Sequence, residues 1–261
     1  MAVVKDYPNP FERSPANTIG VIVIAAYLIY AAIDMDLSLA RFLEGLGHGS
    51  ALLDRMFPPN FTRWELLLDG LIESMQIAII SSVVGIFMSL FIGLFAARNM
   101  MPAWVSSPTR VIIALCRSFH PVIIAILFVK AVGFGALAGL LTLIVASIGF
   151  IAKLFAEAIE EISFKQVEAI RATGASFTSI VLFAVLPQVF SRFIGFSMYQ
   201  LDSNLRNSTM VGIVGAGGLG GTLFSAFQRF DYDFVTAILL TIIAIILLGE
   251  FLSGKVREIF Q

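Results

Sequence analysis

Long apolar runs separated by short polar segments fill most of the chain after residue 17. A bilayer-spanning helix needs about 20 mostly apolar residues, and six runs approach or exceed that length. A further apolar stretch, residues 210–227, is rich in glycine and serine. We expect a short or re-entrant helix there, because irregular backbone at membrane depth must be buried or face water. The pattern predicts an all-α polytopic membrane protein with about six transmembrane helices. The six runs cover residues 18–33, 70–97, 109–132, 134–155, 180–201 and 234–251.

Composition and charge exclude several classes of function. Of the 261 residues, 58% are hydrophobic and 13% are charged, whereas a soluble domain averages about 25% charged residues. The net charge of −1 argues against nucleic-acid binding, which requires a basic surface. The single cysteine, Cys116, excludes an intrachain disulfide, and no cysteine or histidine cluster has the spacing of a metal site. The excess apolar surface must therefore face lipid.

The polar segments divide the chain along its length. Residues 1–17 are polar and proline-rich, and no small-residue cleavage site follows the first apolar run. We therefore expect a retained cytoplasmic tail rather than a signal peptide. Residues 18–34 then form a first transmembrane anchor, and residues 35–69 form an extracytoplasmic loop that folds on the membrane surface. Residues 70–253 form the main transmembrane core, and residues 254–261 form a second cytoplasmic tail.

The distribution of lysine and arginine predicts the orientation. With six spans, both termini lie on the same side of the membrane. If that side is the cytoplasm, the inner segments hold ten of these residues and the outer segments hold five. This excess follows the positive-inside rule. The inner ten are Lys5, Arg13, Arg98, Arg110, Lys153, Lys165, Arg171, Arg192, Lys255 and Arg257, and the outer five are Arg41, Arg55, Arg63, Arg206 and Arg229.

The inner loop, residues 157–187, has the pattern of two short helices joined by a glycine turn. Apolar residues recur between Ile159 and Ile170 at roughly helical spacing, with charged residues between them. Gly174 suits the left-handed conformation that ends a helix, and Ser176 suits the N-cap of the next one. A helix pair on the cytoplasmic face is a natural docking element for a soluble partner. The alternative is a solvated connector with no partner.

The same loop resembles the EAA loop of ABC-importer permeases. That family pattern is Glu-Ala-Ala, three residues, Gly, nine residues, Ile, one residue and Leu-Pro. In the family, the loop is the coupling helix that sits in a cleft of the ATPase subunit. The resemblance implies this role for the matching residues and for the neighbouring Arg171. The matching positions are Glu168, Ala169, Gly174, Leu186 and Pro187, and the departures are Ile170 and Ala184.

From about Phe57 onward, the chain is similar to the permease subunit of phosphonate importers. This resemblance implies a type I ABC importer permease fold in a bacterial inner (plasma) membrane. It also implies a second permease copy, two cytoplasmic ATPase subunits that bind ATP and Mg²⁺, and an extracytoplasmic substrate-binding protein, with no cofactor in this chain. The solute stays open among phosphonate, phosphite, hypophosphite and phosphate. The similar stretches are residues 57–59, 171–175, 185–188, 203–209 and 214–220.

Two glycine motifs resemble nucleotide sites but stand in the wrong context. Residues 215–220 fit the GxGxxG pattern, which needs a preceding strand in a soluble βαβ unit, whereas here they lie in an apolar segment. Residues 249–255 nearly match a phosphate-binding loop, but Val256 replaces the Ser or Thr that holds magnesium. We expect Gly217 and Gly221 to allow close helix packing instead. The chain is therefore expected not to be an enzyme, with ATP hydrolysis in a separate subunit.

Polar residues within the spans are candidates for the translocation path, because ionisable side chains at membrane depth are costly and usually functional. Arg117 and His120 interrupt the third span, where Pro121 bends it. For Arg117, His120 and Arg206, path lining and structural pairing are equally open, including an i,i+4 pair between Asp202 and Arg206. A polar cluster follows the fifth span, and we expect its amides and hydroxyls to line a gate at the outer end of the bundle. The cluster consists of Asp202, Asn204, Arg206, Asn207, Ser208 and Thr209.

Three other functions share some of these features. An ion-coupled secondary transporter would show inverted repeats and paired broken helices, but the two halves of the chain show no convincing self-similarity. A membrane enzyme would need histidines and carboxylates at one site, and His48 and His120 lie far apart in the sequence. A permease of the same class for another small solute, such as an amino acid, remains an alternative.

Overall fold

The computed structural model describes residues 15–260, nearly all of them helical, and contains two compact units. The first unit runs to Arg55. It holds α1 (Pro15–Asp34) and α2 (Leu39–Met56), whose last residue lies just past the boundary. α1 coincides with the expected first anchor. Most of the expected N-terminal tail, residues 1–14, lies outside the described residues.

α2 occupies about half of the segment expected to form the outer loop. Leu39, Leu43, Leu46 and Leu53 share one face of this helix, and none of the helix is buried within the chain. An apolar face opposite charged residues is typical of a helix that lies in a membrane surface. The surface location remains a prediction, now with a helix as its structure.

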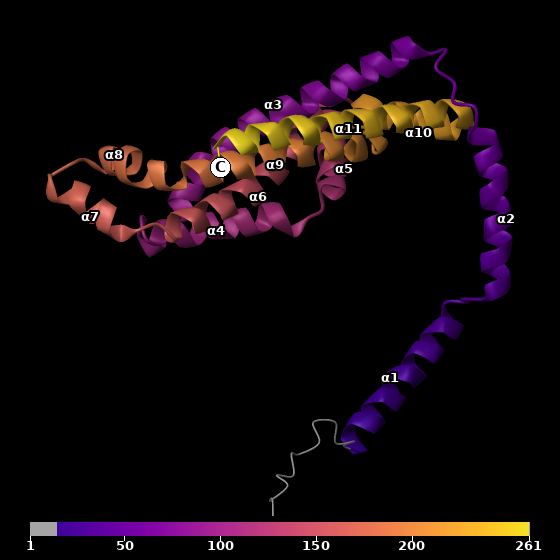
Figure 1. The fold of residues 1–261 in the computed structure, drawn as a ribbon, viewed down its shortest axis with the longest axis horizontal. Helices are drawn as coiled ribbons and strands as arrows, with labels where there is room; N and C mark the ends of the chain where they lie inside the picture. The colour runs from indigo at the N-terminus through magenta and orange to yellow at the C-terminus, as the bar shows by residue number, and fades with distance from the viewer. Residues whose placement is uncertain (1–14, 261) are drawn as a thin grey trace, which may run out of the picture. The chain divides into compact units, whose positions relative to one another are not determined.

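The second unit is a helical bundle. α3 and α9 pack against α6, and α11 packs against α9; Figure 1 shows these helices running alongside one another, with α7 and α8 protruding at one end. Residues 15–260 contain no β-strand, so the expected all-α fold is confirmed. The elements of this unit are α3 (Trp64–Ala96), α4 (Ala103–Ser118), α5 (Pro121–Val132), α6 (Ala136–Glu160), α7 (Phe164–Ala172), α8 (Phe177–Ile180), a π-helix (Val181–Val185), α9 (Leu186–Ile213), α10 (Gly218–Gln228) and α11 (Tyr232–Phe260).

The expected third span is two helices rather than one. Within residues 15–260, five helical segments are long and apolar enough to cross a bilayer, and the pair α4–α5, bent by 92°, makes a sixth. His120 lies at the bend, where its Nδ1 accepts a hydrogen bond from the Val122 N–H at 3.4 Å. Pro121 begins α5, a position at which the backbone N–H has no intrahelical partner to lose. The predicted bend is confirmed, and His120 caps the helix that follows it.

α9 extends well beyond the fifth span expected from the sequence. The expected span ended at Leu201, but the helix continues to Ile213. Its 28 residues correspond to about 42 Å at 1.5 Å per residue, longer than the roughly 30 Å hydrocarbon core. The polar cluster of residues 202–209 therefore lies inside a helix, and its expected position beyond the helix end is wrong. Hydropathy misplaced this end of the helix, because polar residues lower the local hydropathy even where neighbouring helices supply their hydrogen-bond partners.

Small residues allow the central helices to approach closely. A Cβ atom on Gly85 of α3 would lie 2.5 Å from the Cβ of Ser147 on α6. A Cβ atom on Gly220 of α10 would lie 1.9 Å from the carbonyl oxygen of Thr209 on α9. By contrast, a Cβ atom on Gly221 would have no neighbour closer than 3.7 Å. The close approach expected at Gly221 is therefore made by Gly220.

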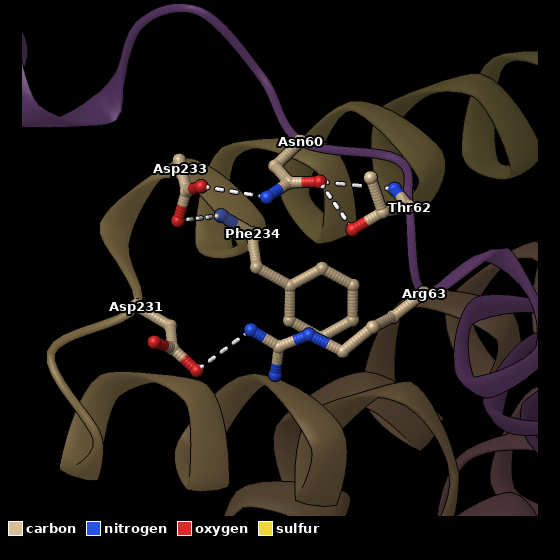
Figure 2. Close-up of polar contacts among 6 residues, drawn as sticks. All are labelled: Asn60, Thr62, Arg63, Asp231, Asp233 and Phe234. Carbon is tan, nitrogen blue, oxygen red and sulfur yellow. Dashed lines mark hydrogen bonds and ion pairs between the residues drawn. The ribbon is translucent and has the colours of Figure 1, made fainter.

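A polar clamp ties the segment ahead of α3 to the start of α11 (Figure 2). Asn60 donates its side-chain amide to Asp233 Oδ2 at 2.8 Å and its backbone N–H to the Asp233 carbonyl at 3.1 Å. Arg63 Nη2 donates to Asp231 Oδ2 at 3.0 Å, and the guanidinium lies 4.6 Å from the centre of the buried Phe234 ring. Two segments far apart in the sequence thus close one end of the bundle together.

Replacing Arg63 by alanine is expected to lower the free energy of unfolding by about 1–2 kcal/mol, because both the ion pair and the cation–π contact are lost. Thermal unfolding in mild detergent would measure this change. A double-mutant cycle with Asp231→Ala should give a coupling of about 0.5–1 kcal/mol. Arg41→Ala, which removes the exposed pair with Asp36, is the matched control and should change nothing measurable. A coupling of zero between Arg63 and Asp231 would contradict the clamp.

Candidate functional site

The expected helix–glycine turn–helix of the inner loop is present as α7, Gly174 and α8. α7 is held to the bundle by Val167, which is fully buried against Ile180, Val185 and neighbouring apolar residues. Glu168, Ala169 and Arg171 are exposed on the same helix. The loop therefore combines an anchored inner face with an exposed outer face, where Glu168 and Arg171 form no side-chain hydrogen bond or ion pair with the rest of residues 15–260.

Gly174 adopts the conformation that the sequence predicts. Its φ is +77°, in the left-handed region, and its N–H donates to the Arg171 carbonyl at 3.0 Å, which closes the turn after α7. A Cβ atom placed on Gly174 would meet nothing within 4 Å. The glycine is therefore required by backbone conformation and not by space. Ser176 caps α8 as expected, with its Oγ 3.4 Å from the Ser179 N–H.

The loop is attached to α9 by side chains that the sequence did not single out as functional. Gln188 accepts a hydrogen bond from the Ser163 N–H at 2.9 Å and donates to the Ser163 carbonyl at 3.4 Å. Arg192, one turn further along α9, pairs with Glu161 at 2.5 Å. Gln188 was visible in the sequence only as part of the stretch similar to phosphonate permeases. These contacts tie the start of α7 directly to α9.

Leu186 and Pro187 mark the point where α9 begins. The Leu186 N–H donates to the carbonyl of Val181, five residues earlier, as in a π-helix. A proline has no N–H and its ring crowds the carbonyl four residues earlier, so the wider π-turn lets the helix continue through Pro187. The Leu-Pro pair of the motif therefore shapes the junction between the loop and α9.

Asn204 lies at the centre of a buried polar network between α3, α6 and α9. Its Nδ2 donates to Ser82 Oγ and Ser147 Oγ, both at 2.9 Å, and its Oδ1 accepts from Gln200 Nε2 at 2.9 Å. Gln200 also donates to Ser147 at 3.1 Å. Asn204 and Ser208 are fully buried. Asn204 joins three helices, whereas Ser208 donates to the Leu205 carbonyl of its own helix, and a gate role for either residue stays a prediction. The serines and Gln200 were missed, although Gln200 and Asn204 form an i,i+4 polar pair in an apolar helix.

The acid and base of the cluster find partners on α11 rather than on each other. Arg206 Nη2 donates to Glu250 Oε1 at 2.8 Å. Asp202 accepts from Ser253 Oγ and lies 3.5 Å from Arg257 Nη2. The i,i+4 pair between Asp202 and Arg206, one of the alternatives left open by the sequence, is not formed, and Arg206 pairs with α11 instead. These partners lie toward the C-terminal end of α11. Asp202 and Arg206 therefore lie nearer that end of the bundle than a gate at the outer end would require.

The remaining path candidates lie on surfaces or at helix joints. Arg117 is exposed and lines a cavity between α4 and α6. Asn207 is half-buried and donates to Ser203 of its own helix at 3.2 Å, and Thr209 is half-buried beside α10. The structure does not bring Arg117 together with Arg206, because Arg206 belongs to the α9–α11 contact. Which of these residues a solute touches remains a prediction.

The glycine-rich segment is a turn followed by α10, as expected of a short helix. The first N–H groups of α10 are taken by α3: Gly218 donates to Glu73 Oε2 and Leu219 donates to Ser74 Oγ, both at 2.8 Å. A Cβ atom on Gly217, whose φ is +85°, would lie 2.6 Å from Glu73 Oε1. The glycines therefore serve a close contact between α10 and α3.

Comparison with known proteins agrees with this geometry. Residues 89–258 match the family described as "Binding-protein-dependent transport system inner membrane component". The phosphite transport system permease PtxC of Stutzerimonas stutzeri is 37% identical over 247 residues, which cover 94% of this chain and 88% of that protein. The phosphate-import permease PhnE of Mycolicibacterium smegmatis is 38% identical over 79% of this chain and 39% of that protein.

The fold has a counterpart among solved structures. The inward-facing MetNI methionine ABC transporter aligns with a TM-score of 0.69 at 24% identity, covering 77% of this chain and 99% of that chain. A likeness at this identity concerns the fold alone. The family match extends over most of the bundle, including the inner loop with its EAA-like motif and the whole of α9. This chain therefore belongs to the binding-protein-dependent transport system inner membrane components, the permeases of ABC importers.

Proposed function

We propose that this chain is the permease subunit of an importer for phosphorus oxyanions such as phosphite or phosphonates. The relatives named for phosphite and phosphate import reach 37–38% identity over most of this chain, whereas a probable D-methionine permease of Pasteurella multocida reaches 28% over 76% of it. The observation that carries the transport role is α7, with Glu168, Ala169 and Arg171 exposed ahead of the Gly174 turn.

In the proposed assembly, two copies of this chain form the path and two ATPase subunits supply the energy. ATP and Mg²⁺ bind to those subunits, and each α7 sits in a cleft of one of them. When the ATPases close, the two loops move together and the bundles tilt to open outward. Val167 and the Gln188–Ser163 contact carry the motion from α7 into α9. A binding protein docks on the opposite side and delivers the solute.

We place both termini of the chain in the cytoplasm of a bacterium, with the bundle in its inner membrane. The pairing of Arg206 with Glu250 supports this orientation. Arg206 counted as an outer residue in the sequence, yet its partner lies toward the C-terminal end of α11, the end assigned to the inside. Moving Arg206 from the outer set increases the asymmetry that the positive-inside rule uses.

The purified chain alone is expected to show no ATPase activity above background. The complete importer in liposomes should hydrolyse ATP faster when its binding protein carries phosphite, because the solute-loaded protein favours ATPase closure. A coupled-enzyme assay of ADP release measures both rates. Robust ATP hydrolysis by the isolated chain would overturn the assignment.

A permease for an amino acid is the second candidate, because members of the same family carry such names. Uptake of labelled phosphite with competition by unlabelled phosphonate, phosphate and methionine separates the two. We expect competition by phosphorus oxyanions and none by methionine. The ion-coupled transporter considered from the sequence is not supported, because the chain belongs to a binding-protein-dependent family.

A further inference from the structure

A cavity of about 200 Å³ lies between α4, α6 and the end of α3. Three cationic side chains line it, Arg110, Arg117 and Lys153, together with one carboxylate, Glu157; the rest of the lining is alanine and isoleucine. A water molecule has a share of about 30 Å³ in the liquid. The cavity therefore has room for a small tetrahedral oxyanion.

Two of the three cations are held in place by their neighbours. Arg110 Nε donates to the Ala96 carbonyl at 2.9 Å, and its Nη2 donates to Glu160 Oε1 at 2.6 Å. Lys153 Nζ lies 3.5 Å from Glu157 Oε1, one turn along α6. A guanidinium has five N–H donors and an ammonium has three, so both groups keep donors beyond these contacts. Arg110 is thus fixed in position, Lys153 lies beside its acidic neighbour, and both keep the capacity to bind an anion.

Arg117 is the cation without a carboxylate. Its aliphatic stem lies over Gly149 of α6, where a Cβ atom would stand 2.9 Å from the Arg117 Cγ. None of the ion pairs formed by residues 15–260 involves Arg117. The planar guanidinium matches two oxygens of a phosphorus oxyanion at once. The glycine at position 149 thus leaves space for the stem of Arg117, which has no acidic partner.

Two other cavities on this bundle are lined by two arginines each. In the one lined by Arg63 and Arg229, Arg63 is paired with Asp231 and its guanidinium lies over the Phe234 ring. The second, between α9 and α11, is balanced in charge. Arg206 and Arg257 line it together with Asp202 and Glu250, and each arginine is paired with one of those acids. Its charges cancel, so an added anion would have to displace a carboxylate. The α4–α6 cavity keeps one positive charge after its pairs are counted, and it gathers three cations where the other two cavities have two each.

We propose that the α4–α6 cavity binds a phosphorus oxyanion group, with Arg117 as the principal donor and Arg110 and Lys153 as its cationic wall. The inference rests on the proposed function, because it names the place in this chain where the solute is held. The free solute and the headgroup phosphate of an anionic lipid share this chemistry. The experiment therefore has one arm for each source.

The test uses the complex of permease and ATPase subunits in lipid nanodiscs, without nucleotide or binding protein. In the first arm, the nanodiscs contain only phosphatidylcholine, and the ³¹P NMR line width of phosphite and methylphosphonate reports binding of the free ion. In the second arm, phosphatidylglycerol is added, and native mass spectrometry counts retained lipid. We expect Arg117→Gln to weaken binding by about tenfold or more, since charge-assisted hydrogen bonds are lost.

Two further variants separate the site from general effects. Arg117→Lys keeps the charge and the stem over Gly149 and should retain weaker binding. Arg98→Gln removes an exposed charge that does not line the cavity and should bind as the unaltered complex does. All variants should elute as monodisperse complexes in size-exclusion chromatography, which reports folding independently.

Each outcome bears directly on the proposal. Arg117-dependent binding of the free ion identifies the solute as the occupant, and Arg117-dependent retention of phosphatidylglycerol alone identifies a lipid headgroup. The absence of both, or binding that Arg117→Gln leaves unchanged, overturns the proposal. Cellular uptake reports the proposed function separately: uptake of phosphite without Arg117-dependent binding would refute this site and leave the proposed transport role intact.

Discussion

Gly174→Val is expected to lower solute uptake by about tenfold or more while the amount of permease in the membrane stays the same. The φ of Gly174 is +77°, and an L-residue in the left-handed region costs about 1–2 kcal/mol, more with a β-branched side chain. Because 1.4 kcal/mol corresponds to a tenfold change in an equilibrium, the turn would re-form in another conformation. α7 would then no longer be presented to the ATPase as it is now. Uptake of labelled phosphite and quantitative membrane immunoblots measure the two effects.

Gly174→Asn is the matched control for this prediction. Asparagine tolerates the left-handed region better than other non-glycine residues, and open space surrounds the position. Uptake should therefore stay close to that of the unaltered permease, with Gly174→Ala between the two. If all three substitutions behave alike, the effect comes from something other than backbone conformation, and normal uptake by Gly174→Val would remove the coupling assignment.

Asn204→Ala is expected to lower the free energy of unfolding by about 2 kcal/mol. Asn204 joins α3, α6 and α9 through contacts to Ser82, Ser147 and Gln200. A hydrogen bond between transmembrane helices contributes about 0.6 kcal/mol on average, and a buried polar group left unpaired adds about 1–3 kcal/mol. The change should appear as a lower melting temperature in mild detergent.

Asn207→Ala provides the comparison, because it removes the same group from the same helix. Asn207 is half-buried, and the side-chain hydrogen bond that it forms is to Ser203, on its own helix. Its substitution should change stability by less than about 0.5 kcal/mol. Equal effects at the two positions would show that the network does not hold the three helices together.

The inner loop was the most predictable part of the chain, because its structure depends on local chemistry. A left-handed turn requires a residue such as Gly174, and the start of a helix favours an N-cap such as Ser176. The sequence itself therefore carries both signals. The break between α4 and α5 was predictable for the same reason, since Pro121 acts on its own backbone. These features would be recognised in any similar segment.

The polar residues of α9 were less predictable, because their roles depend on helices that are distant in the sequence. Sequence spacing allowed a pair between Asp202 and Arg206 as one alternative, whereas α11 supplies closer partners to both. The same spacing offers Asn204 its partner Gln200 but neither Ser82 nor Ser147, because these come from α3 and α6. A one-dimensional pattern records which groups need partners and does not record which helices pack beside them.

Glu73 has a consequence for how an anionic solute meets this chain. The N-terminus of a helix attracts anions through its free N–H groups and its dipole, and the glycine-rich turn ahead of α10 has that form. In this chain, the Glu73 carboxylate already takes the Gly218 N–H. The permease thus carries its own carboxylate at the part of its backbone that most resembles a phosphate-binding site. A passing oxyanion would meet like charge there, and the N–H groups that it would need are already taken by Glu73 and Ser74.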